Sequence, residues 1–560
     1  MAENSETTRH DAAIRNDRLE GGSEQDRCNR YWVWAGLLTV ILFAGAIRIR
    51  VLDVPLERDE GFYAYAGQLI LQRIMPYQAP SPYKYNMPAI YFLYALIIWL
   101  FGQTPTGVHC GFLVANIATL ILLYLLVAKV VDRLAGLAAA AFYSMLSLVP
   151  SVLGMFAHAE HFVVLAALGG ILLLLSAKDS LCWWKLLLSG ILFSLAYLIR
   201  PHGAAFALFA FFYLLVNLLK ASAISWPKRF LSFAVFCAGI AIPLVLVCIV
   251  LLAAGVFGKF WFWTVVYASK YLSMAPLRAG LQFFEMTTVP IVQSAPLIWL
   301  LAAGGLVVSV FTKGIREKGL FLWSFVFFSF ISVCPGLYFR PHYFVLLLPV
   351  VSLLAGIALW FAAGILVRRR FAARPTLAIF YLLFVIILDT AYRQRDFFFT
   401  LSPVEIARKV YDKNPFPESL EIARYIKENS SPNDSVAILG SEPQIFFYAG
   451  RHSATGYADT YDMMVMHDYT LQMQKEMIAE IERACPKFLV FVQVTTSWNA
   501  APDSPKLIFG WFSDYNAKYY EQVGIVDIIS DHKTDYIWGA DAASYKPRSE
   551  YWLSVFRRKD

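Results

Sequence analysis

The chain has 560 residues, of which 58% are hydrophobic, 16% aromatic and 16% charged. Soluble domains average about a quarter charged residues, so this composition and the many apolar runs of about 17–25 residues exclude an ordinary soluble protein and indicate a polytopic membrane protein. The net charge of +8 is modest, and no basic stripe suggests a nucleic-acid partner. The seven cysteines form neither a disulfide framework nor a CxxC metal motif.

Residues 1–30 are polar, of mixed charge and without an apolar run, which predicts a disordered cytoplasmic tail. The first apolar run begins near Tyr31 and is too long and too late for a cleaved signal peptide, so we expect it to remain as a membrane span. The apolar runs predict about eleven transmembrane helices, at roughly 31–48, 108–131, 134–150, 160–177, 184–200, 202–219, 230–255, 290–311, 319–335, 342–366 and 373–390.

Residues 88–101 form a further apolar stretch of about 14 residues, shorter than the roughly 20 needed to cross a bilayer. If this stretch does not cross, five short basic connections lie on one side, as cytoplasmic loops do. If it does cross, the pattern inverts and these loops face outward. We therefore expect a shallow interfacial helix within a first external loop, residues 49–107. On this topology Arg48, Arg50 and Arg58 lie on the outer side against the charge rule, and an anionic ligand is one reason for them.

The chain after residue 391 changes character and lies on the external side in this topology. A stretch from Pro415 to about 429 and residues 467–484 read as helices, and residues 435–440 and 488–492 read as short buried strands. Residues 391–560 are therefore predicted to form a soluble α/β domain.

Three adjacent ionisable residues, Arg58, Asp59 and Glu60, lie where the chain leaves the first span. Asp59 is placed to N-cap a helix from Glu60 to about Arg73, and this structural role would suffice for it. A carboxylate at a helix start beside a cation also stays ionised. Such a group suits a general base that takes a proton from an acceptor hydroxyl or amine. Both interpretations stay open from these residues alone.

A second group, His158, Glu160 and His161, lies at the external end of another predicted span. Ionisable residues at membrane depth indicate function, and the alternative is an interfacial cluster satisfied by water. Their spacing matches no strong metal motif, so no metal ligand is assigned, although a divalent metal is left open.

Cations and histidines also gather on the external side, at Lys84, Arg200, His202, Arg340 and His342. Snorkelling to lipid headgroups explains each one alone. Five such groups on one face fit phosphate binding better, because Arg and Lys pair strongly with phosphate.

The chain resembles the GT-C membrane glycosyltransferases. It is most similar to glycosyltransferase family 39, with its bacterial protein O-mannosyltransferase-like enzymes, lipid A aminoarabinose transferases and rhizobial lipopolysaccharide-core transferases. The resemblance covers the whole chain. It rests on Arg58-Asp59-Glu60 with Tyr63 and Tyr65, and on residues 84–88, 157–162, 336–344, 415–418 and 440–445.

The resemblance implies a GT-C transmembrane domain over residues 31–390, with a catalytic first external loop, and a periplasmic domain over 391–560. It implies a bacterial inner-membrane location. The implied catalytic residues are Asp59 as the base, Glu160 as a second acid and Glu60 as their neighbour. The resemblance also supplies a phosphate anion for the cations selected above. The predicted substrate-binding residues are Arg58, Tyr63, Lys84, His158, His161, Arg200, His202, Arg340 and His342, although the two histidines that flank Glu160 are not part of the family pattern. Relatives differ in metal use, so no cofactor is assigned.

The predicted activity is inverting transfer of a hexose or pentose from a polyprenyl-phosphate sugar donor to an envelope glycolipid, polysaccharide or protein. Membrane lipids are the remaining expected partners. The alternative is a transporter or flippase of a lipid-linked sugar, which would need ionisable residues through the span centres, whereas here they concentrate at the external ends. A non-catalytic scaffold that binds a partner through the C-terminal domain is a third hypothesis.

Overall fold

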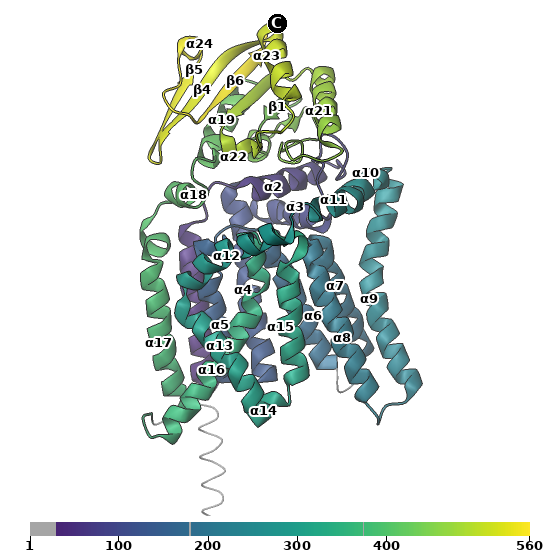
Figure 1. The fold of residues 1–560 in the computed structure, drawn as a ribbon, viewed down its shortest axis with the longest axis vertical. Coiled ribbons are helices and arrows are strands. Elements are labelled where there is room, and N and C mark those ends of the chain that lie inside the picture. Colours follow the sequence, from purple (N-terminus) through teal and green to yellow (C-terminus); the bar gives the residue numbers. More distant parts are fainter. Residues whose placement is uncertain (1–29, 178–180, 373, 560) are drawn as a thin grey trace, which may run out of the picture.

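The structure is a computed structural model that describes residues 30–177, 181–372 and 374–559. A bundle of long helices forms one end of the molecule, a layer of shorter helices crosses the end of the bundle, and a C-terminal α/β unit lies beyond that layer (Figure 1). The predicted tail, apart from Arg30, lies outside the described residues.

The bundle helices coincide with the predicted spans in position. In the described ranges, seven helices are long and apolar enough to cross a membrane, or eight if one bent pair counts as a single span. Three further predicted spans correspond to shorter apolar helices, so a multi-pass protein is confirmed but the count of eleven is not. The bundle comprises helix Arg30–Arg50, α4 (Pro105–Val130), α5 (Arg133–Leu146), α6 (Ala159–Ala177), α7 (Trp183–Ile199), α8 (Ala204–Lys220), α9 (Trp226–Ala253), α13 (Pro296–Phe311), α15 (Gly319–Val333), α16 (Leu348–Arg368) and α17 (Pro375–Arg393), with the short α14 (Lys313–Arg316).

The span predicted over 290–311 is wrong at its start. Helix α12 (Leu277–Ser294) meets α13 at a bend of 103°, and α12 crosses the end of the bundle beneath the C-terminal unit (Figure 1). Pro296 is the first residue of α13, where a missing backbone N–H costs nothing. Hydropathy cannot detect such a bend because it depends on composition along the chain and not on the direction of the helix.

The layer at the end of the bundle contains α2 (Arg58–Leu71) and α3 (Ala89–Phe101), which lie across the bundle (Figure 1). It also contains α10 (Phe257–Trp261), a π-helical turn (Phe262–Tyr267) and α11 (Ala268–Leu272). Helix α3 has 13 residues, which span about 20 Å and cannot cross a hydrocarbon core of about 30 Å. The structure thus places residues 88–101 across the end of the bundle rather than within it, in agreement with the predicted non-spanning helix.

The C-terminal unit holds a six-stranded sheet in the order β2-β1-β3-β6-β4-β5. β1 is parallel to β2 and β3, and the other neighbours are antiparallel. The predicted strands are confirmed as β1 and β3, whereas β2, β4, β5 and β6 were not predicted. The strands are β1 (Ser435–Leu439), β2 (His452–Ser453), β3 (Phe488–Gln493), β4 (Tyr520–Ser530), β5 (Lys533–Trp538) and β6 (Trp552–Arg558). The helices are α18 (Pro403–Tyr411), α19 (Phe416–Glu428), α20 (Gln444–Ala449), α21 (Thr470–Ala484), α22 (Thr495–Trp498), α23 (Leu507–Tyr519) and α24 (Ala540–Ser544).

The C-terminal unit packs directly on α2. A Cβ atom at Gly61 would lie 2.7 Å from Cβ and 2.8 Å from the backbone nitrogen of Gln444, so only glycine allows α2 and α20 to approach this closely. Two cations of the preceding segment also have structural roles. Arg48 donates hydrogen bonds to the carbonyls of Ser147 and Gly154, and Arg50 donates to three carbonyls between 397 and 401. Backbone carbonyls, rather than an anionic ligand, therefore explain Arg48 and Arg50.

Candidate active site

The start of α2 positions the central carboxylate. Glu57 is the N-cap: its Oε1 accepts from the backbone N–H of Glu60 at 2.9 Å, and Oε2 of Glu60 accepts from the N–H of Glu57 at 3.1 Å. This reciprocal pair is a capping box. The prediction that Asp59 is the N-cap is therefore wrong, because the helix begins at Arg58 and Asp59 lies inside its first turn. The side chain of Asp59 therefore does not cap the helix, and it faces a cavity.

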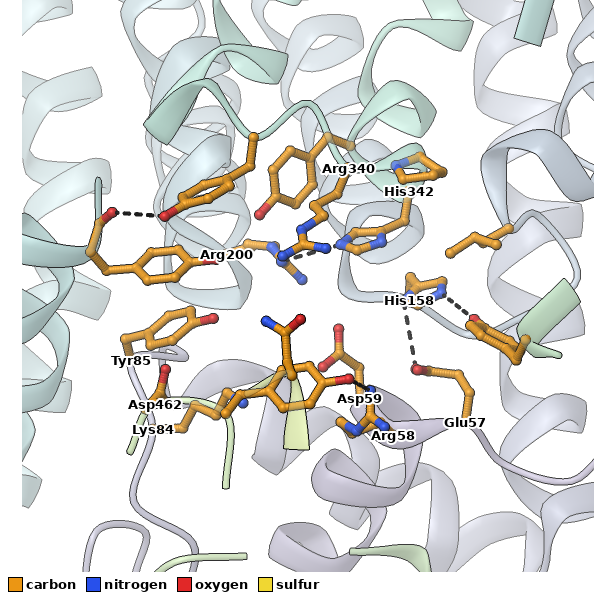
Figure 2. A pocket seen from close by; sticks show the side chains of 18 of the residues that line it. Glu57, Arg58, Asp59, Lys84, Tyr85, His158, Arg200, Arg340, His342 and Asp462 are labelled. Atoms are coloured by element: carbon orange, nitrogen blue, oxygen red, sulfur yellow. Dashed lines mark hydrogen bonds and ion pairs between the residues drawn. The ribbon is translucent and has the colours of Figure 1, made fainter. Parts of the chain in front are cut away.

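The cavity has a volume of about 280 Å³ and lies between the bundle, the layer of α2 and the C-terminal unit. Figure 2 shows Asp59 and Arg58 on one side of it and Arg340 and His342 on the opposite side. Both halves of the chain contribute lining residues: Glu57, Arg58, Asp59, Lys84, Tyr85, Leu153, His158, Arg200, Tyr271, Tyr338, Arg340, Pro341, His342, Tyr343, Tyr411, Tyr461, Asp462, Val465 and Asn499.

Asp59 is the lining carboxyl best suited to stay ionised. Burial opposes its charge, but Arg200 above all, with help from Lys84 and Arg58, lowers the pKa of Asp59 below its usual range. Burial and the neighbouring carboxylates raise the pKa of Glu57 well above its usual range. Burial likewise raises the pKa of Asp462 to about 6.

Arg200 connects α7 to three other groups of the site. Its Nε lies 2.9 Å from Oε1 of the buried Glu160, which starts α6. It also donates to the hydroxyl of Tyr63 at 3.3 Å and approaches Nε2 of His342 at 3.5 Å. Glu160 and Tyr63 do not line the cavity, so they act behind Arg200 and hold its guanidinium towards Asp59.

Two predicted cations are bound to the C-terminal unit. Lys84 forms an ion pair with the buried Asp459, and Asp459 with other nearby carboxylates raises the pKa of Lys84 despite burial. Arg58 donates to the carbonyl of Ser441 at 2.8 Å and to the side chain of Asn414 at 3.0 Å, and it also bonds the Tyr461 hydroxyl. The structure thus places Arg58 as a tether between α2 and the C-terminal unit.

Arg340 differs from these cations. Within the described ranges, no carboxylate lies within ion-pair distance of it, and its guanidinium lies 5.7 Å from the ring centre of Tyr338. Arg340 is exposed, it lines the cavity, and its guanidinium also interacts with the neutral phenol of Tyr271. A guanidinium without an acidic partner keeps its positive charge available for an anion.

The comparisons with known proteins agree with this architecture. Residues 82–247 match the family model for dolichyl-phosphate-mannose-protein mannosyltransferase. ArnT from Cupriavidus metallidurans bound to undecaprenyl phosphate aligns over 91% of this chain and 98% of its own, with a TM-score of 0.54 and 13% identity. The oligosaccharyltransferase AglB from Archaeoglobus fulgidus, in complex with an inhibitory peptide and a dolichol-phosphate, aligns over 94% of this chain and 76% of its own, with a TM-score of 0.52 and 12% identity. A search of curated proteins finds no match.

The chain has the GT-C fold. The resemblance to GT-C membrane glycosyltransferases is confirmed by the family match together with these two structures. In this GT-C chain, the predicted residues Arg58, Asp59, Lys84, His158, Arg200, Arg340 and His342 line one cavity.

Glu60 points away from the cavity. Its carboxylate accepts from the backbone N–H of Ala157 and lies 3.0 Å from Nε2 of His109, whose Nδ1 lies 2.8 Å from the carbonyl of Leu52. The side chain is fully buried. The structure therefore places Glu60 as a link between α2 and α4, outside the lining of the cavity in which it was predicted to act.

Two predicted histidines also lie outside the cavity lining. The buried His161 packs edge-on against Phe112, with ring centres 4.7 Å apart. The ring of His202 packs on Tyr343 at 4.4 Å, and Tyr343 itself lines the cavity. Both histidines support the site through packing rather than by facing it.

The predicted cluster of His158, Glu160 and His161 does not converge on one point for a metal. Asp59, His158 and His342 come closer, with ligand atoms within 4.8 Å of one another. The rings of His158 and His342 are stacked, however, with centres 4.5 Å apart and an interplanar angle of 11°. Because an imidazole lone pair lies in the ring plane, two stacked rings cannot both point at one ion about 2 Å away without reorienting. The residues present do not fit a metal as they stand.

Several lining residues were not predicted. Tyr411, Tyr461, Asp462 and Asn499 come from segments that gave no site signal in the sequence, and Glu57 directly precedes the charged motif Arg58-Asp59-Glu60 but was not selected. Three of these five lie in the C-terminal unit beyond residue 460, and only folding brings them to α2. The contacts of Arg58, the Lys84–Asp459 ion pair and the close packing at Gly61 all join the C-terminal unit to the layer of α2.

Proposed function

We propose that the protein transfers one monosaccharide from a polyprenyl-phosphate donor to an acceptor hydroxyl or amine, with inversion at the anomeric carbon. One observation carries the proposal: in a GT-C fold, the ionised carboxylate of Asp59 faces a cavity whose opposite side presents Arg340 without an acidic partner. A base on one side and an anion-binding cation on the other are the two groups that this reaction requires.

Asp59 acts as the general base in this proposal. Its carboxylate accepts the proton of the acceptor as the acceptor oxygen or nitrogen forms a bond to the anomeric carbon. The bond between that carbon and the phosphate oxygen breaks at the same time, and its electrons leave with the lipid phosphate. Because Arg200 keeps Asp59 ionised, the base is ready at neutral pH.

Arg340 stabilises the leaving group. The donor phosphate is a diester with one negative charge, and the departing lipid phosphate is a monoester that gains a second. Arg200 and Lys84 also face the cavity, but Glu160 and Asp459 already balance much of their charge. Arg340 is therefore best placed to respond to the charge that develops in the transition state.

The carrier is proposed to be a polyprenyl phosphate, in keeping with the undecaprenyl phosphate bound to ArnT and the dolichol-phosphate bound to AglB. The acceptor is proposed to be an envelope glycolipid, polysaccharide or protein, and the transferred sugar a hexose or pentose. The C-terminal unit lines the cavity through Tyr461, Asp462 and Asn499, which supports a role in acceptor binding. The active site and the C-terminal unit are proposed to face the periplasm of a bacterial inner membrane, with residues 31–390 and 391–560 as the two domains.

The test is Asp59→Asn in purified full-length protein. A panel of undecaprenyl-phosphate hexoses and pentoses is supplied with an envelope glycolipid extract, and release of undecaprenyl phosphate is followed by mass spectrometry. We expect kcat to fall by about 10²–10⁴-fold, because loss of a positioned base costs this much. Asp53→Asn is the matched control, since Asp53 lies in the same loop, bonds Thr106 and does not line the cavity. Near wild-type turnover by folded Asp59→Asn protein would refute the base. Accumulation of lipid-linked sugar in proteoliposomes without bond formation would favour a transporter instead.

A further inference from the structure

A second cavity, of about 240 Å³, lies between the layer after α9 and helix α21 of the C-terminal unit. Its lining is unusually aromatic and none of its residues lines the catalytic cavity. The aromatic residues are Tyr83, Phe262, Trp263, Tyr457 and Tyr469. The remaining side chains around it are Lys259, Gln472, Met473 and Glu476.

The aromatic wall is held in place by tight packing. The rings of Tyr83 and Trp263 lie within 23° of parallel with centres 6.3 Å apart, and Tyr457 meets Tyr83 edge-on at 5.5 Å. The backbone N–H of Tyr83 donates to the carbonyl of Gly456 at 2.7 Å. A Cβ atom at Gly456 would lie 2.1 Å from the Tyr83 ring, so glycine is required there. The cavity is therefore preformed.

Polar groups form the rim of this aromatic wall. Lys259 donates to the hydroxyl of Tyr83 at 2.6 Å, and its ammonium lies 4.1 Å from the centre of that ring. The hydroxyl of Tyr457 donates to Glu476 at 2.5 Å, and Gln472 donates to the other oxygen of Glu476 at 2.8 Å. The rim side chains Lys259, Gln472 and Glu476 are exposed, so a ligand can reach them.

We propose that this cavity binds a neutral saccharide unit of the acceptor. A sugar ring has a C–H face, which is attracted to the negative face of an aromatic ring, and a hydroxyl edge, which suits a rim of ammonium, amide and carboxylate groups. A cationic headgroup fits less well, because the ammonium of Lys259 already lies over the face of Tyr83. An anionic ligand is opposed by Glu476.

The aromatic cavity and the catalytic cavity share a wall. Tyr83 lines the first and its neighbour Lys84 lines the second. Tyr267, which follows Trp263 in the π-helical turn, donates to Asp462 at 2.9 Å, and Asp462 lines the catalytic cavity. A saccharide bound beside Trp263 would therefore be a remote unit of an acceptor whose nucleophile reaches Asp59. This assignment of the saccharide to the acceptor rests on the proposed function.

The experiment measures sugar binding without transfer. The full-length protein is kept in a polyoxyethylene detergent, because maltoside headgroups are themselves saccharides. The probes are the methyl glycosides of glucose, mannose, galactose and N-acetylglucosamine, with phosphocholine as the headgroup comparator, followed by saturation-transfer NMR and tryptophan fluorescence. We expect at least one glycoside to bind, and Trp263→Ala to weaken its binding by about tenfold, the upper range for an aromatic contact. Trp261→Ala controls for the loss of a neighbouring tryptophan, because Trp261 lies two residues away and does not line the cavity. Trp263 is buried whereas Trp261 is half exposed, so the folded state of Trp263→Ala is checked separately.

The design separates this inference from the proposed function. Asp59→Asn should bind the glycoside as the wild type does, even though its rate of sugar transfer is expected to fall. If Trp263→Ala unfolds, Glu476→Ala on the exposed rim replaces it and should weaken binding several-fold. The inference is overturned if no glycoside binds, if the folded variants bind as the wild type does, or if phosphocholine binds more tightly than every glycoside through Trp263.

Discussion

Arg340 provides the sharpest test of the electrostatic argument. Its replacement by glutamine removes a positive charge from the cavity but keeps a shorter, neutral side chain that can still donate hydrogen bonds. The other cations of the cavity are paired with carboxylates or bound to the C-terminal unit: Arg200 to Glu160, Lys84 to Asp459, and Arg58 to acceptors of the C-terminal unit. The partner of Arg340 is the neutral phenol of Tyr271. None of them is positioned to replace Arg340 without losing a partner of its own.

The expected loss in kcat follows from the negative charge that Arg340 is proposed to stabilise on the departing lipid phosphate. Removing one preorganised donor from a developing negative charge costs about 10²–10³-fold in kcat. Arg340 is exposed, so water replaces part of its field, and the lower end of that range applies. We therefore expect a loss of about 100-fold, which corresponds to about 2.7 kcal/mol of transition-state stabilisation. The donor KM should change less than kcat, because the second phosphate charge appears only as the bond breaks.

The assay is steady-state release of undecaprenyl phosphate by Arg340→Gln, with Arg340→Lys retaining a point charge and recovering part of the rate. Arg278→Gln is the matched control, since Arg278 is an exposed arginine of α12 that does not line the cavity. A folded Arg340→Gln protein with kcat within about threefold of the wild type would refute the argument. Loss confined to KM would show ground-state binding rather than transition-state stabilisation.

Three further predictions concern the residues around this cation. Arg200→Gln removes the charge that most lowers the pKa of Asp59, so the acid limb of the kcat/KM profile should move to higher pH; an unmoved limb would contradict this. Glu60→Gln should lower the free energy of unfolding by about 2–4 kcal/mol, because it breaks the buried network with His109 and Ala157. Thermal unfolding measures this loss. Unchanged stability with abolished turnover would instead support a catalytic role for Glu60. Gly61→Ala should destabilise by about 1–3 kcal/mol through overpacking on the C-terminal unit, whereas Gly45→Ala, with nothing within 4 Å of its added Cβ, should not.

The sequence predicted the site residues best where each carried its own signal. Arg200 and Arg340 stand in similar Arg-Pro-His segments at span ends, and both line the cavity. Asp59 stands at a helix start beside the first span, and it faces the cavity too. Glu60 is adjacent to Asp59 in the same charged motif, yet it points towards His109 because successive helix residues differ by about 100°. A motif in the sequence cannot show that, of two neighbouring carboxylates, one faces the cavity and the other faces His109.

The sequence by itself determined the membrane character of the chain, the non-spanning length of residues 88–101 and the presence of a C-terminal α/β unit. These features depend on local quantities: apolar length, loop charge and strand-length apolar runs. The tertiary structure alone decided which partner each charge has. Arg58 binds the C-terminal unit and Glu57 caps helix α2, whereas Asp59 and Arg340 face one cavity. Charge pairing depends on distances across the fold, whereas hydropathy depends only on neighbours along the chain.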